Sequence, residues 1–368
     1  MLKNKFSINA PFTAFKYVAI NPNINISSDF VNRFQEASIN EENEVELNTV
    51  DRFKNRTTSN LALSISTKVY GILPFKVGNF QAIRHVMTPR IGFSYSPNYL
   101  KNDNYFQEFN DEYYDYFSGT LIGSTPRTSS KKINLSLGNV FQAKRSINNE
   151  EEKIDLFSLR MNTGYDVNKE EFKLSTLNSS LRSSLKNGTN IDMNFTHDFY
   201  EFNKEESIRI NKLRSIPRLT GIRLSTNFTL KGKKNDIQND NELSEETKNF
   251  LNDFSSNVWQ SRIGVSYTLN KINPENKIEN FWLNSNTSIN VTNNWKLNYN
   301  ARFNLIDNNI VRHNLTLYRE IDCWELFVDW TPNGYARGLY FRLNLKSDML
   351  QDLKVEQKTG IYTTRPSF

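Results

Sequence analysis

The sequence predicts an all-β protein, a transmembrane antiparallel up-and-down β-barrel, and three observations lead to this prediction. Apolar and polar residues alternate over long segments, aromatic residues reach 13%, and hydrophobic residues are only 37% of the 368 residues. Soluble globular domains usually contain roughly 45–50% apolar residues on a slightly different residue set, and disordered chains are poor in aromatic residues. A barrel with a wet interior fits both facts, because only its lipid-facing side must be apolar.

The alternation is clearest in the segment 295–305, in which every second residue is apolar. Trp295, Leu297, Tyr299, Ala301, Phe303 and Leu305 alternate there with Lys296, Asn298, Asn300, Arg302 and Asn304. Similar patterns follow Ile222, Trp259 and Leu339. Because successive side chains of a strand point to opposite faces, each of these segments has one apolar face and one polar face.

Segments of this kind recur along the whole chain and predict about fourteen strands, most of them near the roughly 9–11 residues that a tilted strand needs to cross a bilayer. We place them at Thr13–Ser28, Thr58–Gly71, Val86–Ser96, Lys132–Phe141, Ile154–Tyr165, Phe172–Leu185, Asn190–Tyr200, Thr220–Leu230, Trp259–Leu269, Phe281–Val291, Trp295–Ile306, Val311–Tyr318, Cys323–Trp330 and Leu339–Lys346. A soluble β-sandwich shows the same alternation, but its strands are usually shorter.

The connections between the predicted strands are of two kinds. Asn187-Gly188, Thr292–Asn294 and Asp307–Asn309 are short and suit tight hairpin turns. Three connections are long and polar: Asp29–Thr57, Pro97–Lys131 and Lys231–Val258, the last with a short helix expected near Glu245–Phe254. A simple barrel alternates short turns with long loops, and this chain follows that rule only in part.

Aromatic residues lie near the ends of several predicted strands: Trp259, Trp282, Trp295, Tyr318 and Trp330. In a membrane barrel such residues form girdles at the two lipid–water interfaces. In a soluble protein the same residues would belong to a core, and this alternative stays open at the level of the sequence.

The sequence contains no motif that indicates an enzyme, a metal site or a bound cofactor. Its three histidines, His85, His197 and His313, share no metal-like spacing with the single cysteine, Cys323. No glycine-rich phosphate loop or nucleophile elbow is present. Catalysis by a carboxylate pair that assembles across strands is the one alternative left open. Nucleic acid is not expected as a partner, because the basic residues behind the net charge of +6 are scattered rather than clustered.

The ends of the chain suggest that it is one portion of a larger barrel. The first residues are basic but no apolar stretch of 7–15 residues follows them, so they do not read as a signal peptide. We therefore expect residues 1–368 to be an outer-membrane barrel portion without a periplasmic domain. Because Cys323 is the only cysteine, an internal disulfide is impossible, and we expect its side chain on the lumen face with Glu325 and Asp329.

Two groups of residues resemble one family. The first runs from Arg84-His85 through Pro89 to Tyr95 and Pro97. The second is Cys323-Trp324-Glu325, followed by Leu350-Gln351-Asp352-Leu353-Lys354. Together they resemble the barrel of the LptD family, the lipopolysaccharide-assembly proteins of the outer membrane. The resemblance extends from about Phe12 to Lys354, and over this range the chain resembles the C-terminal part of that barrel.

The resemblance implies that the chain inserts lipopolysaccharide into the outer leaflet of the bacterial cell outer membrane. Members of the family receive lipopolysaccharide from periplasmic bridge proteins, hold an LptE-like plug lipoprotein and open between their first and last strands. The cysteines that pair barrel and periplasmic domain in well-known members are not matched here as a set. Outer-membrane lipid is a further expected partner. The alternatives are another outer-membrane barrel, a passive pore or a receptor, and a soluble all-β binding protein.

Two features of the strands bear on how such a barrel would open and assemble. Pro89 donates no ladder hydrogen bond, so it is expected to loosen pairing near the start of its strand. Residues Gly338, Phe341 and Leu343 resemble the strand signal read by the barrel-assembly machinery, although Ala336 stands where a polar residue is usual. We expect this strand, Gly338–Lys346, to be the final one and to lie at the seam of the barrel.

Overall fold

All regular structure in the described part of the chain is β-strand. The computed structural model describes residues 1–40, 44–77, 80–109, 111–147, 150–185, 188–232, 258–292, 294–334, 336–346 and 353–360. None of these segments forms a helix with the length and hydropathy needed to span a bilayer. The helix expected near Glu245–Phe254 and residue Asn187 of the predicted Asn187-Gly188 turn lie outside the described residues.

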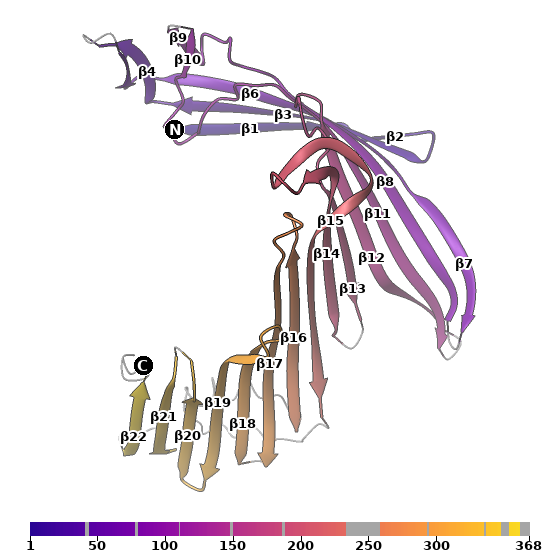
Figure 1. The fold of residues 1–368 in the computed structure, drawn as a ribbon, viewed down its shortest axis with the longest axis vertical. Helices are drawn as coiled ribbons and strands as arrows, with labels where there is room; N and C mark the ends of the chain where they lie inside the picture. Colours follow the sequence, from indigo (N-terminus) through magenta and orange to yellow (C-terminus); the bar gives the residue numbers. More distant parts are fainter. Residues whose placement is uncertain are drawn as a thin grey trace. The chain divides into compact units, whose positions relative to one another are not determined.

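The strands are numbered in the order in which they occur along the chain, and Figure 1 uses the same labels. They are β1 (Leu2–Asn9), β2 (Phe12–Ala14), β3 (Val18–Val31), β4 (Phe34–Ile39), β5 (Val45–Val50), β6 (Lys54–Thr67), β7 (Val69–Val77), β8 (Phe80–Ser96), β9 (Phe106–Phe109), β10 (Glu112–Asp115), β11 (Ser130–Ile147), β12 (Glu150–Asp166), β13 (Leu177–Ser184), β14 (Asn190–Asn203), β15 (Ile208–Lys231), β16 (Trp259–Asn270), β17 (Ile278–Thr292), β18 (Trp295–Asn304), β19 (Asn309–Ile321), β20 (Trp324–Thr331), β21 (Gly338–Leu345) and β22 (Lys354–Gly360).

The topology is antiparallel and up-and-down, as the sequence predicts. Eighteen of the described strands are assigned to one sheet, while β4 with β5 and β9 with β10 form separate hairpins. Each strand from β15 to β21 pairs antiparallel with the next one along the chain. The β8 strand has β6 and β7 on one side and β11 on the other. The all-β, antiparallel fold class is therefore confirmed.

The chain divides into two compact units. Unit 1 contains Met1–Ser180 and Thr196–Leu219, and unit 2 contains Leu181–Phe195 and Thr220–Phe368. Strands β1 to β12 belong to unit 1 and β16 to β22 to unit 2, while β13, β14 and β15 are divided between them.

In unit 2 the pairing register aligns the alternating residues of neighbouring strands into continuous rows. One row, on the apolar face, is Trp259, Ile289, Leu297, Leu317, Val328 and Phe341. The adjacent row, on the polar face, is Gln260, Ser288, Asn298, Thr316 and Asp329. The register therefore converts the period-two pattern of each strand into one apolar and one polar surface.

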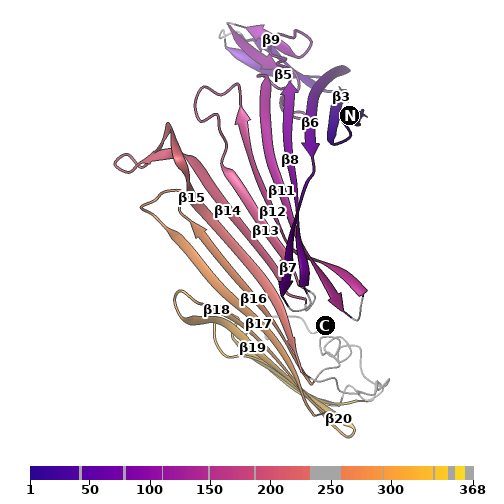
Figure 2. The ribbon, with the colours of Figure 1, turned by 90° about the vertical axis from the view of Figure 1, so that its right-hand side faces the viewer.

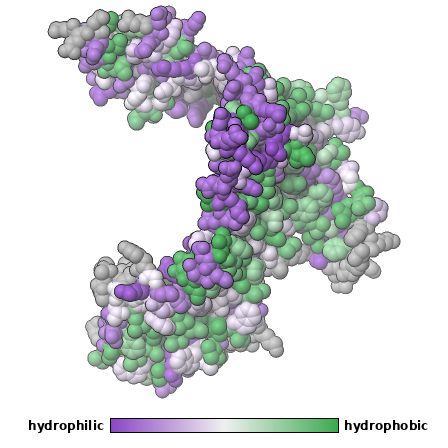
Figure 3. Space-filling view, in the orientation of Figure 1, coloured by the Kyte–Doolittle hydropathy of each residue, from purple (hydrophilic) through white to green (hydrophobic). Residues whose placement is uncertain are grey.

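Unit 1 has the same two-faced character, and its apolar face is not covered by a second layer of the chain. Ile20, Ile65, Ile91 and Leu135 form one cross-strand row. Ile91 is 55% exposed and Leu135 is 41% exposed. In Figure 2 the strands of this unit form a single layer, and in Figure 3 hydrophobic residues gather on the surface at the right of the view. A soluble sandwich would bury these side chains between two sheets.

The one cluster of buried hydrophobic residues found in the described structure lies largely in the connections between the strands. We call it the loop cluster; its buried members are Val31, Phe34, Tyr105, Phe106, Phe117 and Ile122. Val31 ends β3, and the other five come from the connections 32–53 and 97–129. Both connections lie within the segments Asp29–Thr57 and Pro97–Lys131, which the sequence predicts only as long and polar. Both contain short hairpins, β4–β5 and β9–β10, which lie at the upper end of unit 1 in Figure 1.

A buried ion pair anchors the loop cluster to the sheet. Arg56 Nη2 on β6 lies 3.0 Å from Asp29 Oδ2 on β3, and both side chains are almost fully buried. Arg56 Nη1 also donates to the carbonyl oxygen of Gly123 at 2.8 Å. The Tyr105 hydroxyl accepts a hydrogen bond from the Thr57 amide at 2.9 Å. These bonds pair the two buried charges, although Arg56 Nε has no hydrogen-bond partner among the described residues, and they fix the connection against β3 and β6.

Apart from the short hairpins β4–β5 and β9–β10, the additional strands arise in three ways. Thr13–Ser28 is not one strand, because Phe15 and Lys16 have positive φ values of 51° and 66° and turn the chain between β2 and β3. Thr58–Gly71 is broken at Lys68 into β6 and β7. Strands β1 and β22 lie outside the predicted segments, although Leu2, Phe6 and Ile8 of β1 alternate with polar residues.

Two further predicted strands differ in length. Phe172–Leu185 is a strand only over Leu177–Ser184, since Phe172 has a positive φ of 51° and Leu174 makes an isolated bridge to Tyr165. Thr220–Leu230 is the second half of β15, which begins at Ile208. The missed half of β15 carries charged residues on both faces, which hides its period-two pattern.

The loop cluster provides a test of local stability. Phe117 is fully buried, whereas Phe53 in the adjacent connection is 89% exposed. We expect Phe117→Ala to destabilise the loop cluster by about 3–5 kcal/mol through loss of packing, and Phe53→Ala to leave it unchanged. Limited proteolysis of the purified protein should cut the connection 97–129 faster in the first variant only. Equal cutting in both variants would contradict a packed cluster.

Candidate functional site

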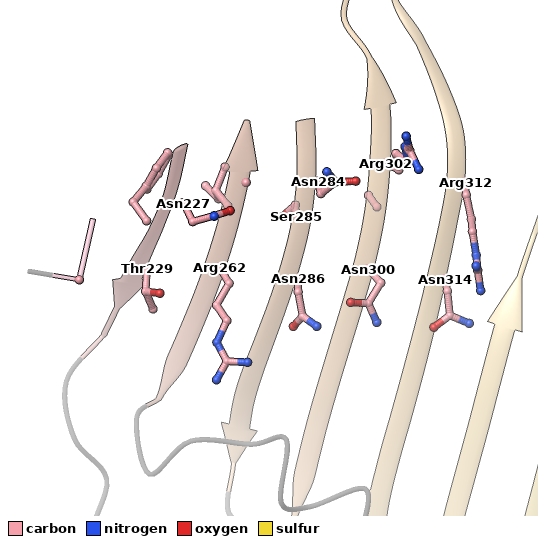
Figure 4. A pocket seen from close by; sticks show the side chains of 15 residues that line it. Asn227, Thr229, Arg262, Asn284, Ser285, Asn286, Asn300, Arg302, Arg312 and Asn314 are labelled. Atoms are coloured by element: carbon pink, nitrogen blue, oxygen red, sulfur yellow. The ribbon is translucent and has the colours of Figure 1, made fainter. Parts of the chain in front are cut away.

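A hollow of about 680 Å³ lies on the polar face of strands β15 to β19 in unit 2. Two adjacent cross-strand rows supply its polar side chains. The first row is Asn227, Gly264, Asn284, Arg302 and Arg312, and the second is Thr229, Arg262, Asn286, Asn300 and Asn314. Figure 4 shows these side chains lying across five neighbouring strands. We call this surface the amide–arginine patch.

The patch is cationic, because its lining contains Arg262, Arg302 and Arg312 but no carboxylate. The Arg302 guanidinium carbon lies 4.4 Å from the ring centroid of Trp282, a stacking that holds the cation in place. With the Gln260 amide turned so that its oxygen faces Arg262, that oxygen accepts from Arg262 Nε at 3.0 Å. Arg312 is exposed. Planar guanidinium groups suit phosphate and carboxylate, to which they donate two parallel hydrogen bonds.

The amide side chains give the patch a second kind of chemistry. Asn227, Asn284, Asn286 and Asn300 each carry one amide acceptor and two amide donors. Such groups match the hydroxyls of a sugar. The fifth amide, Asn314, already donates to Asp329 and Thr331 and accepts from Thr316. Gly264 leaves room for the neighbouring Asn227 side chain, because a Cβ at that position would lie 2.7 Å from Asn227 Oδ1. The arrangement can therefore hold an anionic saccharide without any catalytic group.

A buried polar cluster lies further along the same face, on β19 to β21. Glu325 is 1% exposed and accepts hydrogen bonds from the Tyr318 hydroxyl at 3.2 Å and from Asn344 Nδ2 at 3.1 Å. Lys346 forms an ion pair with Glu320 beside it. Glu325 thus lies on the polar face as predicted. The predicted interfacial role of Tyr318 is wrong, because Tyr318 faces this cluster and is 1% exposed.

The first group of motif residues lies on β8 in unit 1. His85 Nε2 lies 3.0 Å from Asn139 Oδ1, and the imidazole stacks on Phe141 with 4.3 Å between ring centroids. The exposed Arg84 lies with its guanidinium carbon 5.3 Å from the Tyr70 ring centroid. His85 on β8 therefore packs against Asn139 and Phe141 of β11. This packing explains its position without a functional role.

Pro89 lies in the middle of β8 rather than near a strand start, because β8 begins at Phe80. On one side it pairs with Leu137 of β11. On the other side β6 ends its pairing at Arg90 and β7 begins its pairing at Met87. Proline, which has no amide proton, therefore stands where the neighbouring strand passes from β6 to β7, and a loosening of the ladder there stays a prediction.

Tyr95 and Pro97 mark the end of β8. Tyr95 pairs with Leu61 and Lys131, and the Lys131 ammonium lies 6.0 Å from the Tyr95 ring centroid. Pro97 directly follows the strand and begins the connection to β9. These two residues therefore lie where β8 ends and the long connection that contributes to the loop cluster begins.

Cys323 does not lie on a strand, which corrects the prediction. It lies in the two-residue turn with Asp322, which has a positive φ of 46°, and its thiol is free and exposed. The following residue, Trp324, begins β20 on the apolar face and is 40% exposed. The alternation of apolar and polar residues continues from β20 into the turn, so the sequence pattern did not reveal that β20 begins at Trp324.

The strand with Gly338, Phe341 and Leu343 is β21, and it is not the final strand. Phe341 pairs with Val328 on one side and with Gln357 of β22 on the other. The prediction that Gly338–Lys346 ends the sheet is therefore wrong. The role of the three residues as an assembly or gate signal stays a prediction. Residues Leu350, Gln351 and Asp352 of the second motif lie outside the described residues.

Sequence reasoning missed the arginines of the amide–arginine patch. Each of them was visible as a polar position in an alternating strand, but the sequence does not show that residues 262, 302 and 312 lie close together. Only the pairing register of β16 to β19 brings them together. Among the described residues, no three His, Cys, Asp or Glu side chains gather in a way that could hold a metal ion.

Comparison with known proteins gives one family, and the solved structures that match include two remotely similar ones. A family model described as "LptD protein" matches residues 1–200. P. aeruginosa FpvA bound to a heterologous pyoverdine is 9% identical, with 97% of this chain and 48% of that chain covered and a TM-score of 0.26. The FpvAI–pyocin S2 complex is 11% identical, with 93% and 51% covered and a TM-score of 0.25. The chain thus spans about half the length of these structures. No curated protein matches it.

The buried cluster around Glu325 leads to a prediction about folding. In Glu325→Ala, the Tyr318 hydroxyl loses this acceptor and Asn344 Nδ2 keeps the carbonyl oxygen of Leu345. We expect the loss of the buried carboxylate as a hydrogen-bond partner to cost about 1–3 kcal/mol. We expect less of this variant to reach the folded, heat-modifiable form on gels, and Glu325→Gln to retain most of it. Cys323→Ser, a change in the exposed turn, serves as the control. Normal folding of Glu325→Ala would show that the cluster does not stabilise β19 to β21.

Proposed function

The chain belongs to the LptD family, whose members transport lipopolysaccharide at the outer membrane, and on this premise we propose that it forms part of the barrel wall through which lipopolysaccharide is inserted into the outer leaflet. The family match over residues 1–200 is the observation that carries this proposal. The family is one of transport and assembly rather than of enzymes. The proposal includes the localisation of the family, so we place this chain in the bacterial outer membrane.

The two faces of the sheet support this proposal, because lipopolysaccharide also has two halves. Its acyl chains require an apolar environment, and its phosphorylated saccharide requires water and polar groups. The apolar face of the sheet is suited to contact acyl chains, and its exposed side chains have no covering layer in unit 1. On the polar face, the amide–arginine patch offers cations and amides to the saccharide. Transport along such a wall keeps each half of the molecule in its preferred solvent.

Pro89 lies within β8, which has strands paired on both sides, so it does not mark the seam between first and last strands that the family mechanism needs. The periplasmic bridge proteins and an LptE-like plug lipoprotein are the partners that the family implies. A passive pore or a receptor is the alternative. In a passive pore or a receptor, the same polar face would select anions without transporting lipopolysaccharide.

A triple substitution tests the proposal directly. Replacing Arg262, Arg302 and Arg312 by Gln removes the cations of the patch while keeping polar side chains. A charge-assisted hydrogen bond contributes about 1.5–3 kcal/mol, so we expect lipopolysaccharide delivery to the cell surface to fall at least about tenfold. Replacing the surface cations Arg33, Arg52 and Lys101 by Gln should have no effect. The readout is labelled lipopolysaccharide at the surface of cells that depend on the variant.

The control variant separates a specific role from a general effect of charge. Unchanged delivery in the Arg262, Arg302 and Arg312 variant would contradict a role of the patch in transport. Altered anion conductance in planar bilayers, with unchanged delivery, would favour the passive pore.

We also propose that the barrel-assembly machinery reads Phe341 and Leu343 on the apolar face of β21. We expect Phe341→Ser to reduce the amount of barrel assembled in cells severalfold, while the purified chain still refolds in detergent. Phe327→Ser, an aromatic change on the polar face of the neighbouring strand, is the control for general destabilisation. Equal loss of refolding and of cellular assembly in the Phe341 variant would show that the residue acts through stability alone.

A further inference from the structure

Three tryptophans occupy equivalent places in unit 2. Trp259, Trp295 and Trp324 are the first residues of β16, β18 and β20. All three lie on the apolar face, because Trp259 shares a row with Ile289 and Leu297, and Trp324 pairs with Ile321 and Leu345. Trp259 and Trp324 are 39% and 40% exposed, so neither belongs to a core.

The register shows that the three tryptophans are displaced by a constant step. The row of Trp259 reaches β18 at Leu297, two residues inside Trp295. The row of Trp295 passes through Arg319 and reaches β20 at Leu326, two residues inside Trp324. Each tryptophan is therefore shifted by two residues over two strands from the one before it.

This step has the size that a tilted strand in a barrel requires. One residue advances about 3.4 Å along a strand and neighbouring strands lie about 4.8 Å apart, so the line through the tryptophans is inclined by about 35° to the hydrogen-bonded rows. Strands in membrane barrels tilt by about 35–45° to the barrel axis. In such a barrel the three indoles lie at one height along the axis and form a level belt.

The opposite edge of the apolar surface fits the thickness of a bilayer. Eight residues beyond Trp259 and Trp295 lie Tyr267 and Phe303, which is about 22 Å further along the axis at this tilt and close to the roughly 25 Å apolar band of outer-membrane barrels. The Tyr267 hydroxyl donates to Glu279 Oε1 at 3.1 Å. An ionised side chain thus appears on this face where the apolar surface ends.

A cation lies at the level of the tryptophan belt on the apolar face. Arg319 pairs with Trp295 across the strands, and its guanidinium carbon lies 4.4 Å from the indole centroid. On the apolar-face positions of β16 to β21, Arg319 and Glu279 are the charged residues. Within the described chain no carboxylate forms an ion pair with Arg319. A half-buried guanidinium stacked on an interfacial indole is placed where lipid phosphates lie.

We propose that Trp259, Trp295 and Trp324 form a level belt at one lipid–water interface and that Arg319 binds the phosphate of a membrane phospholipid there. The inference rests on the proposed function only in requiring a barrel wall in a bilayer. Phospholipid is favoured as the occupant because the site is on the outer, apolar face, away from the amide–arginine patch through which saccharide would pass. The belt would then hold this edge of the wall at a fixed depth.

The belt is tested by fluorescence quenching of the full chain in vesicles of phospholipids brominated at different acyl depths. With Trp282→Phe and Trp330→Phe, the remaining indoles are the three of the belt. We expect them to be quenched most by bromines near the headgroup. A chain that keeps only Trp282, which is on the polar face, should be quenched little. Strongest quenching of the belt by bromines at the acyl termini would overturn the belt.

The phosphate site is tested by native mass spectrometry of the chain extracted from vesicles of phosphatidylglycerol, phosphatidylethanolamine and lipopolysaccharide. We expect Arg319→Gln to reduce retained phospholipid by about tenfold, the equivalent of one charge-assisted hydrogen bond. Arg319→Lys should retain an intermediate amount, and Arg337→Gln, an exposed cation outside the belt, should retain the normal amount. Unchanged retention in Arg319→Gln would overturn the site.

The two experiments separate this inference from the proposed function. Retention of lipopolysaccharide in place of phospholipid at Arg319 would overturn the choice of occupant and leave transport intact. Absence of quenching by every brominated lipid would show that the wall is not in the bilayer, and both proposals would fall. Normal lipopolysaccharide delivery by Arg319→Gln, together with lost phospholipid, would support a site separate from transport.

Discussion

The structure depends on one constraint: a sheet one layer thick must satisfy two different environments at once. Most side chains on one face are apolar and most of their neighbours on the other face are polar, so neither face can be buried against the other. The row from Trp259 to Phe341 and the row from Gln260 to Asp329 are adjacent positions on the same strands. A slip of one residue would exchange the two faces along a whole strand. Register is therefore what gives each face its chemistry.

The same constraint explains where buried hydrophobic packing occurs. The loop cluster lies around the connections that bear on β3 and β6, where Phe117 is fully buried, while the sheet itself keeps Ile91 exposed on its apolar face. A lipid bilayer would supply to that face the contacts that a second protein layer supplies in a soluble sandwich. The amide–arginine patch and the tryptophan belt are then two surfaces of one wall, one suited to a hydrated saccharide and the other to the edge of the lipid.

The sequence predicted what depends on periodicity and missed what depends on register or on local turns. Alternation identified the apolar and polar faces of β16 to β21, because a period of two needs no knowledge of the partner strand. It could not place Arg262, Arg302 and Arg312 side by side, since three strands contribute one residue each. It also assigned Cys323 to a strand although this residue lies in a turn, and it did not predict the break at Lys68 between β6 and β7. The order in the connection around Phe117 was missed because its aromatic residues follow no regular period.

The central claim is that the apolar face contacts acyl chains while the alternate face contacts water, and accessibility along one strand tests it most directly. Spin labels placed singly at Leu297, Asn298, Tyr299 and Asn300 of β18 can be exposed to oxygen, which concentrates in lipid, and to a water-soluble nickel complex. The account predicts that oxygen accessibility is high at Leu297 and Tyr299, and that nickel accessibility is high at Asn298 and Asn300. Equal access of the nickel complex to all four positions, in the reconstituted full chain, would contradict it.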